Sequence, residues 1–415
     1  MERHAARATP LVPVLAFTAL ASFSTGSATL GIFFLTEQAF RFGAAQQYAL
    51  GLLVGVTYTA GALGAARLRG FLARALHLSA RGTLACLSVV MAGLMLVPLL
   101  VPEPAALVVV LALYAPITGA LWPLVEGYVS GGRRAGELRS AIGRFNIVWS
   151  ATLLPSFWVQ ARSPALVFAS IAAMHLVALV FLPRFLREPG EHPHDEPHAV
   201  PPDYPELLRA HRVLHACSYL AMYALSPALP GLLGRFHLTP VWASTLASTW
   251  LLARVLTFAL LERWHGWHGR WAVAWIGIAL VLCGFGTTVL APYLGPGLPV
   301  LTLGLLAFGG GLAALYTAAL YYAFEVGGNE GGSSHEALIG LGYSLGPLCG
   351  LATCGLARAG ALAPEQRAGA LLVLIAAVCS GGALWAWSQR RSRHRAAATA
   401  GAAEPALPPR AHREV

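Results

Sequence analysis

The feature that most constrains this chain is a series of apolar stretches, each about as long as a helix that crosses a lipid bilayer. A spanning helix needs about 20 mostly apolar residues. The 415 residues are 57% hydrophobic and only 11% charged, whereas a soluble domain averages about 25% charged residues. We expect twelve spans, at residues 9–36, 43–66, 82–102, 104–130, 139–161, 163–183, 211–234, 239–261, 271–291, 298–324, 336–357 and 367–388. The sequence therefore predicts an all-α membrane protein.

The positions of the arginines orient these spans. The chain contains no Lys, and its Arg residues fall between the apolar stretches, which is unlike a nucleic-acid-binding surface. Positively charged residues concentrate in cytoplasmic loops. If the N-terminus is cytoplasmic, the outer loops carry only Arg41, Arg162, Arg235, Arg358 and Arg367. We therefore expect an integral membrane protein with both termini in the cytoplasm. The expected location is a bacterial inner (plasma) membrane.

A polar stretch rich in Pro, His and acidic residues separates the sixth and seventh spans and divides the chain into two halves. The halves look weakly duplicated, because Ala-Leu-Trp followed by Glu126 closes the fourth span and Ala-Leu-Tyr followed by Glu325 closes the tenth. Repeated halves are typical of transporters. The expected organisation is an N-terminal six-helix bundle at 1–186, a cytoplasmic linker at 187–210, a C-terminal six-helix bundle at 211–389 and a basic, disordered cytoplasmic tail at 390–415.

This architecture resembles the major facilitator superfamily over residues 9–388. The loop between the second and third spans keeps Arg67, Arg69 and Arg74 of the family's Gly-x-x-x-Asp-Arg-x-Gly-Arg-Arg motif, without its Asp and second Gly. The family's antiporter motif Gly-x-x-x-Gly-Pro-x-x-Gly stands at residues 342–350, in the eleventh span rather than the fifth, so it implies no antiport. The resemblance implies two pseudo-symmetric bundles, a central cavity lined by spans one, four, seven and ten, and a secondary transporter of unassigned subfamily.

Polar side chains on or near these spans are the candidate substrate contacts. The first span is rich in hydroxyl groups, which suit a polar cavity but also allow close helix packing. The tyrosines lie in the middle of their spans, whereas tyrosines that only anchor a helix lie at the membrane edge. The candidates are Ser22, Thr25, Tyr114, Thr118, Tyr219, Tyr223, Trp250, Arg254 and Tyr316. Such a set suits a small polar or amphiphilic solute.

Arg254 is the most informative of these residues. It precedes Glu262, at the expected cytoplasmic end of the eighth span, by two helical turns, which at ~1.5 Å per residue places it roughly 12 Å deep. No Asp or Glu of any expected span lies at that depth. Trp250, one turn away, is the expected cation–π partner. Two interpretations remain open, an anchor for an anionic solute and a structural arginine that bonds carbonyl groups and Trp250.

A gate is expected at the cytoplasmic ends of the spans. Glu126 and Glu325 occupy matching positions there, and Arg144 opens the fifth span on the same side. Opposite charges on the two halves would hold this face closed, as in the related sugar porters, so neutralising Glu126 is expected to open it. The alternative is a set of solvated groups, since exposed ion pairs contribute only ~0–1 kcal/mol each.

Other polar groups favour structural interpretations. His192, His194, Asp195 and His198 suit a solvated linker better than a weak metal site, and His175 suits a bonded core histidine. His215 is expected near the membrane interface. The glycines at 309–311 indicate a kink or a close helix contact. The six Cys form no CxxC pair. No cofactor or metal is expected.

Three classes of function are compatible with this pattern. A secondary transporter working by alternating access agrees best with it. A transport-inactive membrane scaffold or sensor would be favoured if bulky apolar side chains filled the cavity. An enzyme is not expected, because no paired carboxylates and no Ser–His arrangement are predicted at membrane depth. The expected partners are a small-molecule substrate and membrane lipids, without nucleic acid, and the expected state is a monomer.

Overall fold

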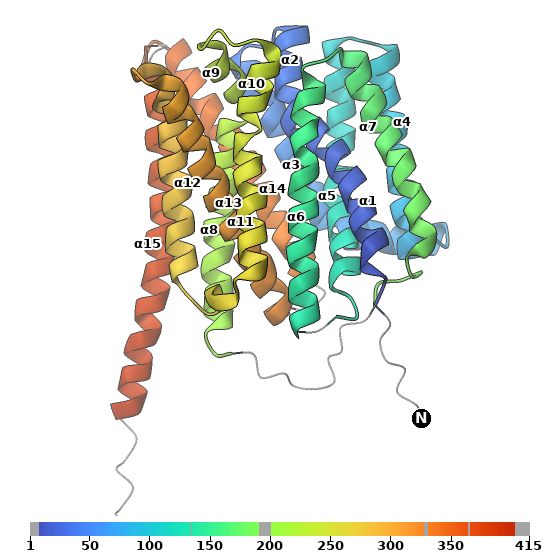
Figure 1. Ribbon diagram of the computed structural model, residues 1–415, viewed down its shortest axis with the longest axis vertical. Coiled ribbons are helices and arrows are strands. Elements are labelled where there is room, and N and C mark those ends of the chain that lie inside the picture. Colours follow the sequence, from blue (N-terminus) through green and yellow to red (C-terminus); the bar gives the residue numbers. More distant parts are fainter. Residues whose placement is uncertain (1–7, 134, 191–200, 328–330, 364–365, 403–415) are drawn as a thin grey trace, which may run out of the picture.

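The computed structural model is a bundle of long helices (Figure 1) in the part of the chain that it describes, residues 8–133, 135–190, 201–327, 331–363 and 366–402. The helices are α1 (Leu11–Gly26), α2 (Ile32–Phe40), α3 (Ala44–Ala75), α4 (Ala80–Leu100), α5 (Pro104–Ser130), α6 (Ala135–Gln160), α7 (Pro164–Ala178), α8 (Tyr204–Leu225), α9 (Leu229–Gly234), α10 (Pro240–Ala247), α11 (Thr249–Arg263), α12 (Ala272–Leu290), α13 (Gly297–Gly327), α14 (Gly331–Arg358) and α15 (Arg367–Ala402). A π-helical segment, Ser27–Gly31, joins α1 to α2.

Ten helical segments within the described residues are long and apolar enough to cross a membrane, judged by length and composition. The expected spans at 139–161 and 211–234 are helical, as α6 and as α8 with α9, but they are not among these ten. Helix α8 is buried along almost its whole length. Its polar residues therefore face protein, and it needs no apolar outer surface. The count of twelve transmembrane helices stays a prediction.

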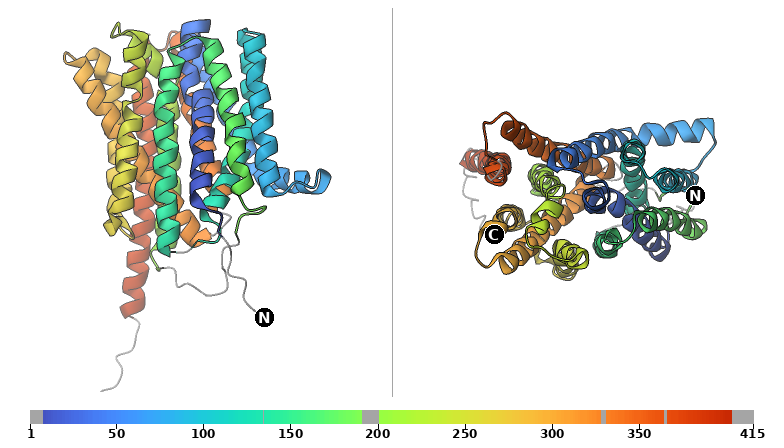
Figure 2. Two further views of the ribbon diagram at one scale, coloured as in Figure 1. Left: turned by 45° about the vertical axis from the view of Figure 1, so that its right-hand side comes forward. Right: turned by 90° about the horizontal axis from the view of Figure 1, so that it is seen from above.

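The helices divide into two groups that lie side by side. Helices α1 to α7 pack mainly on one another, as do α8 to α15, and Figure 2 shows this division from above. Across the boundary, α3 packs along α14 and α6 packs along α11. Glycine permits the first contact, because a Cβ atom on Gly55 would lie 2.3 Å from the carbonyl oxygen of Tyr343.

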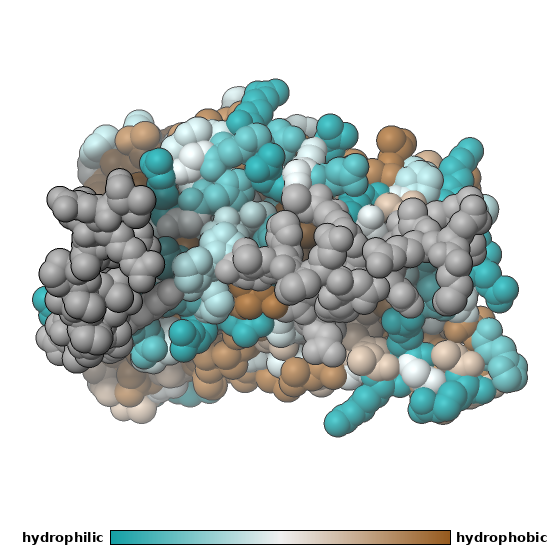
Figure 3. Space-filling model, turned by 90° about the horizontal axis from the view of Figure 1, so that it is seen from below, coloured by the Kyte–Doolittle hydropathy of each residue, from teal (hydrophilic) through white to brown (hydrophobic). Residues whose placement is uncertain are grey.

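The starts of α1 and α8 and the end of α15 lie at one end of the bundle (Figure 1), which we name the linker end. The opposite end is the far end. Figure 3 views the linker end and shows many hydrophilic side chains around it. Arg390 and Arg391 lie there, with their guanidinium groups over the rings of Trp271 and Trp387 at 5.5 and 4.0 Å.

Two expected segment boundaries are corrected. Helix α15 continues to Ala402 and projects beyond the bundle (Figure 1), so residues 390–402 are helical rather than a disordered tail. Helix α8 begins at Tyr204, so the last residues expected in the linker belong to a helix. The histidines and the aspartate proposed as a weak metal site lie at 191–200, outside the described residues. Among the described residues, no group of three or more His, Cys, Asp or Glu side chains is placed to hold a metal ion.

Candidate functional site

Arg254 lies between the two halves of the bundle and is fully buried. Helix α11 carries it, and its guanidinium lies 4.3 Å from the ring centroid of Trp149 on α6. The rings of Tyr219, Phe258 and Tyr316 lie 5.7, 5.4 and 5.1 Å away. Because Trp149 belongs to the first half and the other rings to the second, this aromatic cage joins the halves around a cation.

The hydrogen bonds of Arg254 are incomplete. Its Nη2 donates to the hydroxyl of Tyr219 at 2.8 Å, but Nε and Nη1 have no hydrogen-bond partner. Among the described residues, no carboxylate forms an ion pair with it. The expected contact with Trp250 is wrong, because that ring packs against Phe308 at 6.5 Å, and Trp149 from the other half covers the guanidinium instead. A buried cation with unpartnered donors is costly unless a ligand or water completes its bonds.

Aromatic rings fill the space around Arg254. Trp149 and Tyr316 stack at 5.5 Å with an interplanar angle of 9°, and Tyr343 stacks on Tyr223 at 3.6 Å. Two cavities of about 20 Å³ each remain at the centre, and each has room for about one water molecule. In this conformation the described residues of the centre therefore leave no room for a molecule larger than water.

The π-helical segment shapes one wall of this centre. Thr25 donates to the carbonyl of Ala21 at 2.9 Å, and Thr29 donates to that of Thr25 at 2.8 Å. Hydroxyl groups that bond the preceding turn in this way bend helices, and π-helical turns are frequent at functional sites. Both threonines line the first of the small cavities. The hydroxyl groups of the first span therefore have both expected roles. Thr25 and Thr29 line a cavity, whereas Ser24 donates to the Ile171 carbonyl of α7 and so joins two packed helices.

A pair of carboxyl groups joins the two halves towards the linker end. Glu126 on α5 is 1% exposed and Glu336 on α14 is 3% exposed. Helices α5 and α14 pack on each other, and the two carboxyl groups interact across this contact. The hydroxyl of Tyr58 on α3 donates to Oε2 of Glu336. The expectation of no paired carboxylates concerned membrane depth, whereas this pair lies near the end of α5 and the start of α14.

The predicted gate of opposite charges is also wrong for Glu126, whose partner across the halves is another acid. Arg144 is exposed, and Glu325 is half-buried. Arg133, just after the end of α5, donates to the carbonyl oxygens of Tyr128 and Val129, at 2.9 and 2.7 Å. It caps the end of α5 because the last carbonyl groups of a helix lack intrahelical partners.

Buried histidines extend the polar centre. His215 on α8 and His335 on α14 are buried and stack at 4.6 Å with an interplanar angle of 13°. His335 also contacts the ring of Tyr316 at 5.0 Å, one of the rings around Arg254. His215 was expected near the membrane interface. It is instead a member of a buried polar cluster.

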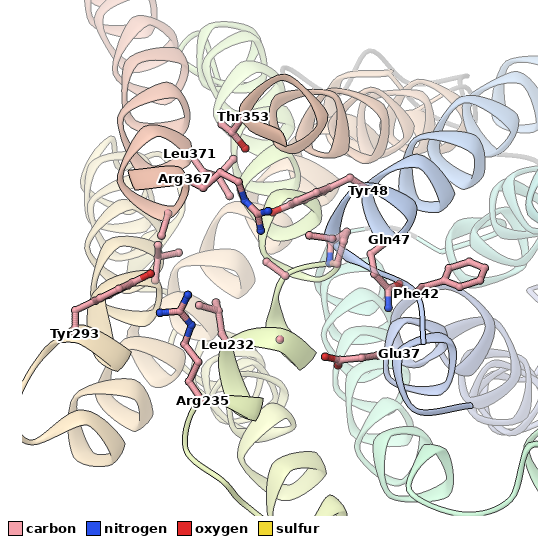
Figure 4. A pocket seen from close by; sticks show the side chains of 16 residues that line it. Glu37, Phe42, Gln47, Tyr48, Leu232, Arg235, Tyr293, Thr353, Arg367 and Leu371 are labelled. Atoms are coloured by element: carbon pink, nitrogen blue, oxygen red, sulfur yellow. The ribbon is translucent and has the colours of Figure 1, made fainter. Parts of the chain in front are cut away.

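A larger pocket, of about 180 Å³, opens at the far end (Figure 4). Arg235 and Arg367 line it, with Glu37 on its opposite side. The guanidinium of Arg235 lies 5.0 Å from the ring centroid of Tyr293. Beside the pocket, the hydroxyl of Tyr48 on α3 donates to the Ala224 carbonyl of α8 at 3.1 Å and joins the halves.

Comparison with known proteins shows a fold but no close relative. No protein-family model and no curated protein match the chain. The nucleoside transporter NupG, as its D323A mutant, matches with a TM-score of 0.65 and 14% identity over 91% of this chain and 99% of that one. A bacterial homologue of the human lysosomal transporter Spinster, inward-facing and unoccupied, matches with a TM-score of 0.65 and 14% identity over 92% of this chain and 96% of that one. The human organic anion transporter MFSD10 (TETRAN) matches with a TM-score of 0.61 and 16% identity over 89% of this chain and 98% of that one.

The chain has the fold of major facilitator superfamily transporters. It is an integral membrane protein, and its subfamily stays unassigned.

The major facilitator fold brings part of the predicted site together. Thr25, Thr118, Tyr219 and Tyr316 line the two central cavities, and Arg254 lies behind them in its cage of rings. Tyr223 lies next to this centre, because its ring stacks on that of Tyr343, which lines both cavities. These residues come from the spans that the resemblance placed around a cavity, except for Arg254 on α11.

The structure places three other candidates away from the centre. The hydroxyl of Tyr114 and Nε2 of His175 lie 2.7 Å apart inside the first half, which supports the structural interpretation of His175. Ser22 is buried but lines neither central cavity, and the same is true of Trp250.

Sequence reasoning missed several residues of the site. Tyr58, Trp122 and Tyr343 line both central cavities, and Glu336 lines one of them. The eleventh span was expected to begin at residue 336, which placed Glu336 at its edge, whereas α14 already begins at Gly331. The adjacent His-Glu pair at the start of an apolar stretch is the signal that would have found it.

Proposed function

We propose that this protein is a secondary transporter that moves a small anionic solute by alternating access, and that Arg254 binds the anionic group. The observation that carries the proposal is a fully buried guanidinium between the halves, with two nitrogen atoms that lack partners. Charge-assisted hydrogen bonds from a carboxylate or phosphate to these nitrogens would offset the cost of burying the cation. MFSD10, which shares the fold, is a human organic anion transporter.

The surroundings of Arg254 suggest the remainder of the solute. The stacked rings of Trp149 and Tyr316 offer flat apolar faces from opposite halves, and Thr25 and Thr118 add hydroxyl groups nearby. An amphiphilic anion with an aromatic or other flat apolar part would contact both kinds of surface once the halves separate. Aromatic pairs add ~0.5–1.5 kcal/mol beyond the area that they bury.

The far-end pocket is the proposed entrance for this solute. Arg235 and Arg367 line it, against one acid, Glu37, and an excess of positive charge in a cleft raises the local concentration of anions. The linker end would then face the cytoplasm, in accord with the positive-inside rule. A bacterial inner membrane and a monomeric state complete the proposal.

A thermal-shift screen of the purified protein tests the solute class. Aromatic carboxylates and organic phosphates are compared with their neutral amide and alcohol analogues, because a ligand that binds the native state raises stability with its concentration. Stabilisation by anions alone supports the proposal, and equal stabilisation by the neutral analogues contradicts it.

The aromatic filling of the centre favours a second candidate, a scaffold or sensor that does not transport. The ligand from the screen decides between the two when the protein is reconstituted in liposomes. Binding with no uptake would identify a sensor, and uptake would identify a transporter.

A further inference from the structure

The carboxyl pair of Glu126 and Glu336 presents a hydrogen-bonding problem. Neither oxygen of Glu126 receives a hydrogen bond from any described donor, yet its carboxyl group lies against that of Glu336. An ionised carboxylate only accepts hydrogen bonds, whereas a protonated one also donates. The contact is therefore a hydrogen bond only if one of the two carboxyl groups carries a proton.

No positive charge of the described residues pairs directly with either acid. The guanidinium of Arg254 lies 5.1 Å from the ring of Tyr316, which lines the same small cavity as Glu336. Among the described residues, neither acid forms an ion pair with an Arg or a His. The histidine next to Glu336 in the sequence stacks on His215 instead. The nearby titratable groups are the hydroxyls of Tyr58 on α3, Tyr219 on α8, Tyr316 on α13 and Tyr343 on α14. Two charged carboxylates in such a site would repel each other, and no described cation is paired with either of them.

We propose that Glu126 and Glu336 together bind one proton, and that closure of the linker end requires this proton. The pair connects α5 of the first half to α14 of the second, so separation of the halves at this end breaks the contact. Water then reaches both groups, and exposed glutamates are ionised at neutral pH. On closing, one carboxylate takes up a proton from solution and donates the new O–H to the other. On opening, the same proton returns to solution.

This linkage has a defined sign and does not depend on the proposed solute. The closed form holds one proton more than the open form, so raising the pH shifts the population towards the form open at the linker end. Exchange of one proton changes the ratio of the two forms by about tenfold per pH unit, in the range where the open form is ionised and the closed form is protonated.

The proposal reverses the effect expected for a gate of opposite charges. A glutamine at 126 has an amide that donates to the carboxylate of Glu336, and it therefore replaces the bound proton. Glu126→Gln is expected to stay closed at the linker end across the pH range, rather than to open.

Infrared spectroscopy of the purified full-length protein detects the proton directly. A protonated carboxyl group has its own C=O stretching band, which shifts when D₂O replaces H₂O. The parent should show such a band at neutral pH, and Glu126→Gln and Glu336→Gln should each lose it. Glu103→Gln, at an exposed acid of the far end, is the control that retains it. A band that persists in both of the first variants overturns the proposal.

Distance measurements between spin labels test the effect on the gate. Glu137→Cys on α6 and Arg263→Cys on α11 place labels on exposed residues of opposite halves at the linker end, in a background without the native cysteines. The two helices touch there, since a Cβ on Gly143 would lie 2.4 Å from Cγ of Glu262. The long-distance fraction of the parent should rise with pH, and Glu126→Gln should abolish this dependence.

Two outcomes of the distance measurement contradict the proposal. One is a distance distribution of the parent that does not change with pH. The other is a distribution that follows the concentration of Na⁺ at constant pH, which would make the pair a sodium site. The Glu103→Gln control, with the same labels, must keep the pH dependence of the parent.

Discussion

Replacing Arg254 by alanine tests the proposed solute site most directly. The guanidinium offers Nε and Nη1 to an anion in a fully buried position. Truncating one partner of a buried, hydrogen-bonded charge pair costs about 2–5 kcal/mol. Since 1.4 kcal/mol corresponds to a tenfold change in Kd, the affinity for the anionic solute should fall by roughly 30- to 4,000-fold.

The same substitution should leave the fold almost unaltered. It removes the hydrogen bond to Tyr219, worth about 1.5–3 kcal/mol, and the cation–π contact with Trp149, worth about 2 kcal/mol. It also removes two buried nitrogen atoms without partners, and each of these costs about 1–3 kcal/mol. The opposing contributions cancel to within about 2 kcal/mol, so the thermal unfolding of the variant should resemble that of the parent.

Ligand titration of purified proteins, followed by calorimetry, measures both expectations. Arg254→Lys keeps the charge but loses the planar fork, so its affinity should lie between those of the parent and the alanine variant. Arg162→Ala removes an exposed arginine of the far end and serves as the matched control. An Arg254→Ala variant that binds the anion as tightly as the parent would refute the role of this residue.

Three further predictions concern topology and packing. Cysteines introduced at Glu103 and Gly295 should react with an impermeant reagent from outside the cell, and labelling from the cytoplasm alone would invert the topology. Gly309→Ala should destabilise the protein by about 1–3 kcal/mol in thermal unfolding, because its Cβ would lie 1.9 Å from a carbonyl oxygen of α11. Gly310→Ala, whose Cβ would have a contact of 3.5 Å, is its control and should change stability by less than the first variant does. Tyr114→Phe leaves a buried histidine without its partner and should cost about 1–3 kcal/mol without changing solute affinity, so a loss of affinity would contradict its structural role.

The sequence predicts the helical membrane fold because the signal is local. A run of about 20 apolar residues is readable without knowledge of its neighbours, and the structure shows helices at each expected span, including α6 and α8. The same local signal misjudges helix ends. Glu336 was placed at the edge of its span, because the first residues of α14 are polar. The apolar run therefore begins several residues after the helix does.

The sequence also identified Arg254, because a charge deep in an apolar segment is conspicuous wherever its neighbours lie. It could not identify the partners of this charge. Spacing along a helix indicated Trp250, whereas the ring that covers the guanidinium is Trp149, from α6 of the other half.

What the sequence determined by itself was therefore the helical, apolar character of the expected spans and the presence of a charge, Arg254, deep within one of them. The tertiary structure alone decided which groups meet between the halves, namely the aromatic cage and the carboxyl pair. The physical reason is that the contacts across the halves join residues more than a hundred positions apart, such as Tyr58 and Glu336 or Trp149 and Arg254. Their distance depends on how the helices pack, which no local pattern of residues records.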